Sequence, residues 1–232
     1  MATAAADRAG TLLSDLRRIF GDRLLSLIVY GDPDESAPLS CLALVTTLDT
    51  TDLDACARVR HSWERQGLAT PLVLPEHEFR RSLDAFPLEY SEMVRAHAHV
   101  YGPDPFEGVT IAREDLRRAC ETQVKSHLLH VREEYIEASG RPQAIADLVQ
   151  MSAPAFAALV RNVARLHGVT TSDRAAATRE GARIAELPEG IVASVLALEH
   201  STGLPSTDPA RLFPEYLAAI EHLAAYIDRW RA

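Results

Sequence analysis

Three charged residues recur along one predicted helix at spacings that place them on a single face. Glu121, Lys125 and Arg132 stand at positions i, i+4 and i+11, which share a face of an α-helix. Lys125 is the single lysine among the 24 basic residues of the chain. Two interpretations follow. Glu121 and Lys125 could form a surface ion pair, or the face could be the polar wall of an interdomain cleft in which Lys125 and Arg132 bind an anion.

Histidines occur twice at spacings that a metal ion could use. His97 and His99 alternate along a predicted strand and therefore share one of its faces, and two imidazoles so placed can bind Zn²⁺. His127, His130 and Glu134 lie at i, i+3 and i+7 of a predicted helix. The pair has no evident third ligand, and the helical set would leave the ion open on one side. We therefore expect an exposed strand face and an ordinary helix surface beside the core, without a metal.

The sequence lacks the common short motifs of nucleophilic hydrolases, of nucleotide-binding loops and of cysteine-based sites. The chain contains no G-x-S-x-G, no P-loop and no G-x-G-x-x-G, the motifs of hydrolases and of two classes of nucleotide-binding protein. Its cysteines, Cys41, Cys56 and Cys120, show no CxxC spacing, which disfavours a zinc ribbon or a disulfide framework. Cys41 and Cys120 fall on predicted apolar surfaces, so we expect small buried side chains, with Cys41 reactive only if it lines an empty cleft.

The elements that position these residues change in type along the chain. In the first hundred residues, short apolar β-rich runs alternate with amphipathic segments. Strands are predicted over 24–30, 41–47, 70–74 and 97–101, and helices over 7–20, 52–66 and 76–83. The stretch 31–38 contains two prolines and is predicted to be a loop.

After the sequence Gly102-Pro103-Asp104-Pro105, every predicted element is helical. Apolar stripes predict helices over 113–138, 143–167, 173–186, 191–201 and 209–230. The first stripe comprises Leu116, Cys120, Val124, Leu128, Val131 and Tyr135. Pro154 is expected to kink or split the second helix. The predicted fold class is α+β, with a mixed sheet and flanking helices over 1–106 and an all-α bundle over 107–232.

Composition narrows the function classes. The chain has 232 residues, of which 47% are hydrophobic and 25% charged, as in globular proteins. The balance of 33 acidic against 24 basic residues gives a net charge of −9, which argues against a nucleic-acid partner. Asp7 and Asp15 interrupt any N-terminal apolar segment, and no membrane-spanning run is recognised. We expect a cytoplasmic protein, and the preference for Arg over Lys suggests a bacterial one.

The order of these segments resembles a nucleotidyltransferase domain of the polymerase-β superfamily, and the whole chain resembles two-domain bacterial members with a helical C-terminal domain. The run LIVYG, ending at Gly31, matches the strand that ends in the family's Gly-Ser. The run SCLALV, from Ser40 to Val45, stands where the family has Ser-Asp-x-Asp. Weaker similarities are Phe86-Pro87-Leu88-Glu89-Tyr90, Val100-Tyr101-Gly102-Pro103-Asp104, and the helical residues Glu121, Lys125, Arg132 and Tyr135.

The resemblance implies an active site that this sequence does not complete. In the family, the Gly-Ser turn holds a triphosphate, and two aspartates one residue apart bind the Mg²⁺ that stabilises phosphoryl transfer. Here Asp32 replaces the serine, and Cys41 and Ala43 replace the aspartates. We therefore expect no catalytic residue and no metal or other cofactor, with Mg²⁺ and a nucleoside triphosphate required only if the family's activity survives. The remaining positions of the degenerate site are Gly31 and Ser40, with Glu89, Lys125 and Arg132 as candidates along a cleft.

Three functions are compatible with this sequence. The favoured one is a binding or regulatory protein that takes a nucleotide-like small molecule in its cleft, or a protein partner or second copy of the chain. The first alternative is a divergent, active nucleotidyltransferase, for example an aminoglycoside-modifying one, that recruits other acids. Candidates for these acids are Asp32, Asp34, Glu35, Asp49, Asp52 and Asp54. The second alternative is one member of a toxin–antitoxin-like pair.

Overall fold

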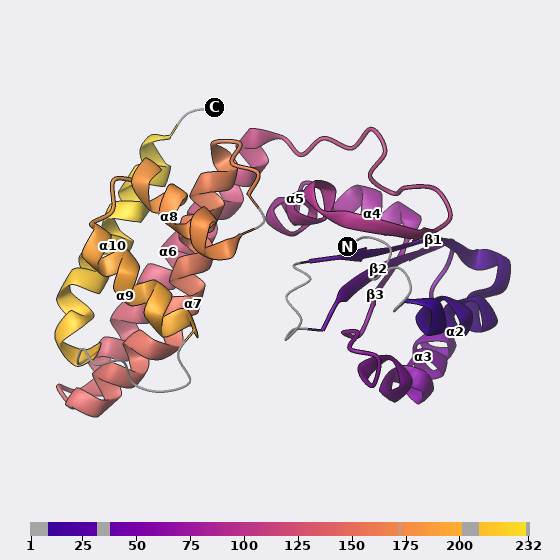
Figure 1. Cartoon of the computed structure of the whole chain (residues 1–232), viewed down its shortest axis with the longest axis horizontal. Coiled ribbons are helices and arrows are strands. Elements are labelled where there is room, and N and C mark those ends of the chain that lie inside the picture. Colours follow the sequence, from indigo (N-terminus) through magenta and orange to yellow (C-terminus); the bar gives the residue numbers. More distant parts are fainter. Residues whose placement is uncertain (1–8, 32–37, 172, 201–208, 231–232) are drawn as a thin grey trace. The chain divides into compact units, whose positions relative to one another are not determined.

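The computed structural model describes residues 9–31, 38–171, 173–200 and 209–230. The chain divides into two compact units, residues 1–112 (unit 1) and 113–232 (unit 2), which are described separately (Figure 1).

Unit 1 is built on a four-stranded mixed sheet with the order β3-β2-β1-β4. The strands are β1 (Leu24–Tyr30), β2 (Ser40–Val45), β3 (Leu72–Pro75) and β4 (His97–Tyr101). β1 pairs antiparallel with β2 and β4, whereas β2 and β3 run parallel. The predicted mixed sheet is confirmed.

Helices cover both faces of this sheet. α2 (Gly10–Phe20) and α3 (Thr50–Glu64) lie on one face, and α4 (Glu76–Ser82) and α5 (Pro87–Arg95) lie on the other (Figure 1). A short 3₁₀ turn, η1 (Gly21–Arg23), joins α2 to β1. Because side chains alternate along a strand, β2 sends Cys41 and Ala43 into the apolar cluster beneath α2 and α3, and Leu42 and Leu44 into the cluster beneath α4 and α5.

A half-buried carboxylate on α2 hydrogen-bonds two side chains of α3. Asp15 is 14% exposed, and its Oδ2 accepts hydrogen bonds from Trp63 Nε1 at 3.0 Å and from Ser62 Oγ at 3.3 Å. The Trp63 side chain is among the largest fully buried ones, so its N–H has no access to bulk water.

Replacing Asp15 by Ala should lower the free energy of unfolding of unit 1 by about 1–2 kcal/mol, because the indole N–H would be left without an acceptor. Urea unfolding followed by Trp63 fluorescence in a Trp230→Phe background measures this change. The control is Asp54→Ala, since Asp54 is an exposed acid on α3. Equal midpoints for the two variants would contradict the anchoring role of Asp15.

Unit 2 is a bundle of α6 (Arg113–Ala138), α7 (Pro142–Leu166), α8 (Arg174–Ile184), α9 (Glu189–His200) and α10 (Pro209–Arg229). α7 packs against each of the other four helices, and it continues through Pro154 without splitting. Among the described residues beyond position 107 there is no strand, as predicted. α7 is also long and apolar enough to cross a membrane, a property that it shares with the central helices of soluble bundles.

One helix was missed from the sequence, and one prediction about burial was wrong. The sequence did not predict α5 as a helix. Tyr135 was assigned to the buried stripe of α6, but it is 42% exposed, with its ring stacked on Phe213 at a centroid distance of 4.1 Å. A strict four-residue repeat drifts by about 40° per step in a helix of 3.6 residues per turn. The buried side therefore continues at Val131 and Ala138 and leaves Tyr135 at its margin.

Candidate functional site

The strand site implied by the family resemblance begins where β1 ends. Gly31 follows β1 and has a φ of +104°, a backbone conformation that favours glycine. Ser40 starts β2, is half-buried and is the register partner of Tyr30 on β1. Asp32, Asp34 and Glu35 lie outside the described residues.

The two positions that would carry metal-binding aspartates are buried. Cys41 is 1% exposed and Ala43 0%, and both belong to the apolar cluster that includes Leu12, Leu16 and Trp63. Burial raises the pKa of the Cys41 thiol to about 12, so the sulfur is protonated at neutral pH and is a poor ligand for a hard cation. The described residues here do not fit Mg²⁺, which needs oxygen ligands.

Two of the acids that follow β2 have structural roles, whereas Asp54 is exposed on α3. Asp49 caps α3 by accepting a hydrogen bond from the Asp52 N–H, and the Asp52 side chain accepts one from the Asp49 N–H. Asp52 also forms a two-bond ion pair with Arg23, each bond 2.7 Å long. Within the described part of the chain, no group of three His, Cys, Asp or Glu residues is placed to hold a metal.

Glu89 does not join the strand site. It is exposed on α5, the helix whose Tyr90 and Met93 cover the other face of the sheet. The side chains of Cys41 and Ala43 point away from that face. The structure therefore does not bring Glu89 together with these two residues.

The histidines of β4 contact neighbouring oxygens in unit 1. The ring nitrogens of His97 face the Met93 carbonyl at 2.7 Å and the Asp104 carboxylate at 3.2 Å. His99 is exposed, and its Nε2 faces the Gly102 carbonyl. The predicted exposed strand face is thus correct for His99, whereas His97 is only 14% exposed, because the segment after β4 folds back over it.

The histidines of α6 point in different directions. His127 is half-buried, with its Nε2 3.4 Å from the hydroxyl of Tyr216, which donates to Ser152 Oγ at 2.9 Å. Burial, and to a smaller extent His130, lowers the pKa of His127 to about 4. His130 is an exposed partner of Glu133, so it does not share a site with His127.

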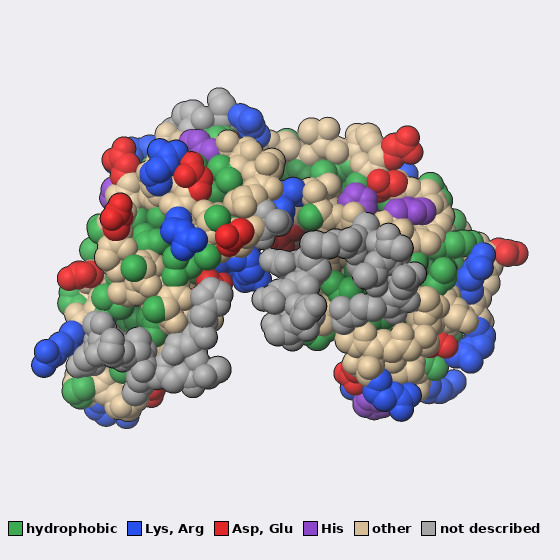
Figure 2. All heavy atoms as spheres, in the orientation of Figure 1, with side chains coloured by type: hydrophobic (Ala, Val, Ile, Leu, Met, Phe, Trp, Pro, Cys, Tyr) green, Lys and Arg blue, Asp and Glu red, His purple; other side chains and the backbone are tan. Residues whose placement is uncertain are grey.

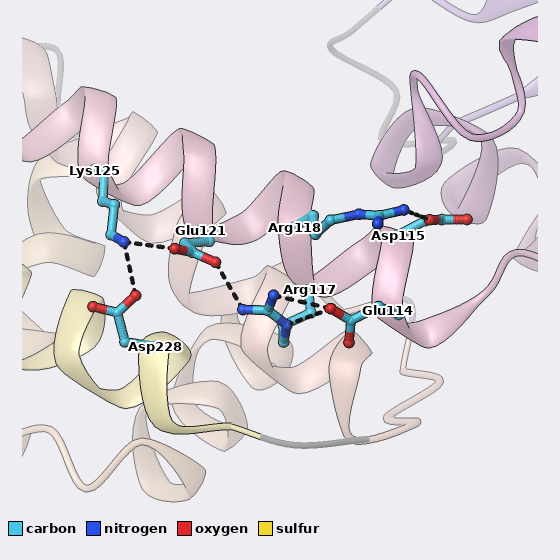
Figure 3. Close-up of polar contacts among 7 residues, drawn as sticks. All are labelled: Glu114, Asp115, Arg117, Arg118, Glu121, Lys125 and Asp228. Atoms are coloured by element: carbon cyan, nitrogen blue, oxygen red, sulfur yellow. Dashed lines mark hydrogen bonds and ion pairs between the residues drawn. The ribbon is translucent and has the colours of Figure 1, made fainter.

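A chain of ion pairs runs along α6 from Glu114 through Arg117, Glu121 and Lys125 to Asp228 of α10 (Figure 3). Glu121 lies between Lys125, at 2.5 Å, and Arg117, at 2.7 Å, and these two cations lower the pKa of Glu121 to about 2. Lys125 also contacts Asp228 of α10 at 2.8 Å. Arg132 pairs with Glu221 of α10 at 2.7 Å. The predicted Glu121–Lys125 pair is present, and anion binding by Lys125 and Arg132 stays a prediction.

Sequence reasoning missed the partners on α10. Asp228 and Glu221 are seven residues apart, as are Lys125 and Arg132, so both pairs can form along two neighbouring antiparallel helices. The equal seven-residue spacing of the two cations on α6 and the two acids on α10 was the sequence feature that could have indicated this pairing. On the face of unit 2 drawn in Figure 2, acidic and basic side chains are interspersed rather than gathered by sign.

Comparison of the sequence with protein-family models and with curated proteins finds no match. Among solved structures, the chain is similar to the spectinomycin adenyltransferase AAD(9) from Enterococcus faecialis, determined with ATP and spectinomycin. The TM-score is 0.57 at 12% sequence identity, and the match covers 96% of this chain and 99% of that one. At this identity the likeness shows that the two chains share a fold.

Proposed function

We propose that this chain is a nucleotidyltransferase-like binding protein that does not carry out metal-dependent nucleotidyl transfer. The observation that carries the proposal is the pair of buried, carboxylate-free positions Cys41 and Ala43 on β2. Phosphoryl transfer depends on positioning and on a metal that neutralises developing charge. A neutral thiol and a methyl group provide no ligand for that metal.

The proposed ligand is a nucleotide-like anion. The support is the fold shared with AAD(9), whose structure was determined with ATP, together with the cations of α6. Lys125 and Arg132 are 47% and 48% exposed, so their remaining N–H groups are open to an incoming phosphate. Such a phosphate would compete with Asp228 and Glu221 for these cations. Binding is therefore modest and weakens with added salt.

Combining Lys125→Ala with Arg132→Ala should abolish the increase in melting temperature that ATP produces in the parent chain. The melting temperature without ATP should change little, because exposed ion pairs contribute little to stability. The control is Arg118→Ala, which removes an exposed cation of α6 that pairs with Asp115 on the same helix. An unchanged ATP response in the double variant, or no response in the parent, would contradict a nucleotide site on α6.

The loss of transfer activity is tested by incubating the full chain with ATP, Mg²⁺ and spectinomycin or other aminoglycoside-class acceptors and measuring pyrophosphate release. AAD(9) is the positive control, and we expect no release above background from this chain. Metal-dependent release that stops on replacing Asp32, Asp34 or Glu35 by Asn or Gln would overturn the proposal in favour of a divergent enzyme.

A further inference from the structure

The end of α7 carries a histidine that contacts two aromatic side chains from the end of α10. His167 directly follows Leu166, the last residue of α7. Its Nε2 lies 2.7 Å from the hydroxyl of Tyr226 and 3.1 Å from Nε1 of Trp230. The His167 ring also packs against both of these rings, with centroid distances of 6.2 Å and 6.0 Å. One imidazole nitrogen therefore joins the ends of two helices of unit 2.

The chemistry of the two partners fixes where the His167 proton lies. An indole nitrogen can only donate, so the hydrogen bond from Trp230 needs an Nε2 that carries no proton. Burial, and to a smaller extent Glu186, raises the pKa of Tyr226, so its hydroxyl keeps its proton and donates to the same nitrogen. His167 is then a neutral imidazole with its single proton on Nδ1.

The charged groups around His167 disfavour a second proton on its ring. Partial burial lowers the pKa of His167, and the guanidinium of Arg113, at the start of α6, lowers it further. Among the described residues, no carboxylate raises it. Glu186, which lies beyond the end of α8, acts on Tyr226 instead. Asp228, between the two aromatic residues on α10, is paired with a cation of α6.

We propose that His167 is a pH-sensitive acceptor that holds the Trp230 indole against the end of α7 while its ring is neutral, and gives the indole up when Nε2 takes a proton. A protonated Nε2 points an N–H at the indole N–H, and two donors repel one another, whereas the Tyr226 hydroxyl can turn and accept. The change is limited to the Trp230 side chain, because Ile227 is completely buried and keeps this turn of α10 in place. Acid pH thus uncovers an aromatic surface at this end of unit 2, independently of the proposed nucleotide site.

Nuclear magnetic resonance of the ¹⁵N-labelled full chain tests both parts of this proposal. At pH 8, long-range proton–nitrogen correlations of the His167 ring should show the tautomer with its proton on Nδ1. Between pH 8 and pH 5, exchange of the Trp230 indole N–H with water, corrected for the intrinsic rate, should become about fivefold faster, as expected for the loss of one neutral hydrogen bond. The indole N–H of Trp63, which donates to Asp15, is the internal reference and should keep its corrected rate.

Two glutamine variants separate His167 from the other histidines of the bundle. His167→Gln retains an oxygen acceptor that does not titrate, so the corrected exchange rate of the Trp230 indole should be the same at both pH values. His222→Gln is the matched control. His222 is an exposed histidine of α10 whose Nε2 faces the Ala185 carbonyl at 2.8 Å, and its replacement should leave the pH dependence unchanged.

A third variant keeps the proposal testable if His167→Gln perturbs the bundle. Arg113→Gln removes the cation that acts on the ring, so the midpoint of the pH dependence should move upward, toward the ordinary value of a histidine. The proposal would be overturned by a His167 ring that carries its proton on Nε2 at pH 8, or by a Trp230 indole that does not respond to pH in the parent. A pH dependence that survives in His167→Gln, or a midpoint that does not move in Arg113→Gln, would also overturn it.

Discussion

Replacing Ala43 by Asp should lower the free energy of unfolding of unit 1 by about 4 kcal/mol or more. Ala43 is completely buried in a cluster of apolar side chains beneath α2 and α3. An ionised carboxylate there would have no cation and no water, and a protonated one would still lack hydrogen-bond partners. Few kinds of substitution lower the free energy of unfolding this much, and burying an unpaired charge is one of them.

The measurement is urea unfolding followed by Trp63 fluorescence in a Trp230→Phe background, so that the signal comes from unit 1 alone. Thr46→Asp is the matched control, since Thr46 is an exposed residue directly after β2; we expect a change of about 0.5 kcal/mol or less. If Ala43→Asp is as harmless as the control, position 43 opens onto a polar cleft and the account of the strand site is wrong.

Acidification should destabilise unit 2 by about 3 kcal/mol between pH 6.5 and pH 4 through His127 alone. Burial lowers the pKa of His127 from 6.5 to about 4 in the folded chain. The unfolded chain therefore takes up a proton below pH 6.5, whereas the folded chain does so only near pH 4. The unfolded state binds more protons in this window, so stability falls as the pH falls.

The measurement is native-state hydrogen exchange of α7, the central helix of the bundle, at a series of pH values with correction for intrinsic rates. His127→Phe should remove most of the pH dependence, because its ring cannot titrate and still packs beside Phe156, against which His127 is stacked. His130→Phe, which alters an exposed histidine on the same helix, should leave the dependence in place. The role of His127 would be contradicted if the pH dependence persisted in His127→Phe and disappeared in His130→Phe.

Elements with a clear apolar pattern could be predicted from the sequence. β1 and β2 are short, continuous apolar runs, and α6 and α10 carry stripes at helical spacing, so their positions follow from periodicity. α5 was missed because it has only nine residues and is followed directly by the alternating residues of β4. The burial of Cys41 and Cys120 was predicted correctly from their places on these surfaces.

Contacts between distant segments could not be predicted in this way. The spacing of Glu121 and Lys125 predicts their pairing within α6, but it carries no information on Asp228, more than a hundred residues away. His97 and His99 share a strand face, as predicted. The contacts of the two His97 ring nitrogens with Met93 and Asp104 could not be predicted, because they depend on how α5 and the segment after β4 fold around that strand.

The most direct test of the central claim, that the strand site on β2 does not hold a metal, is an isothermal titration of the full chain with ATP in EDTA and again in excess Mg²⁺. A site made of side-chain cations gains nothing from the metal, so we predict that Mg²⁺ does not strengthen the binding of ATP. A tenfold or larger increase in affinity on adding Mg²⁺ would contradict the claim, because it would require protein ligands for the metal that Cys41 and Ala43 do not supply.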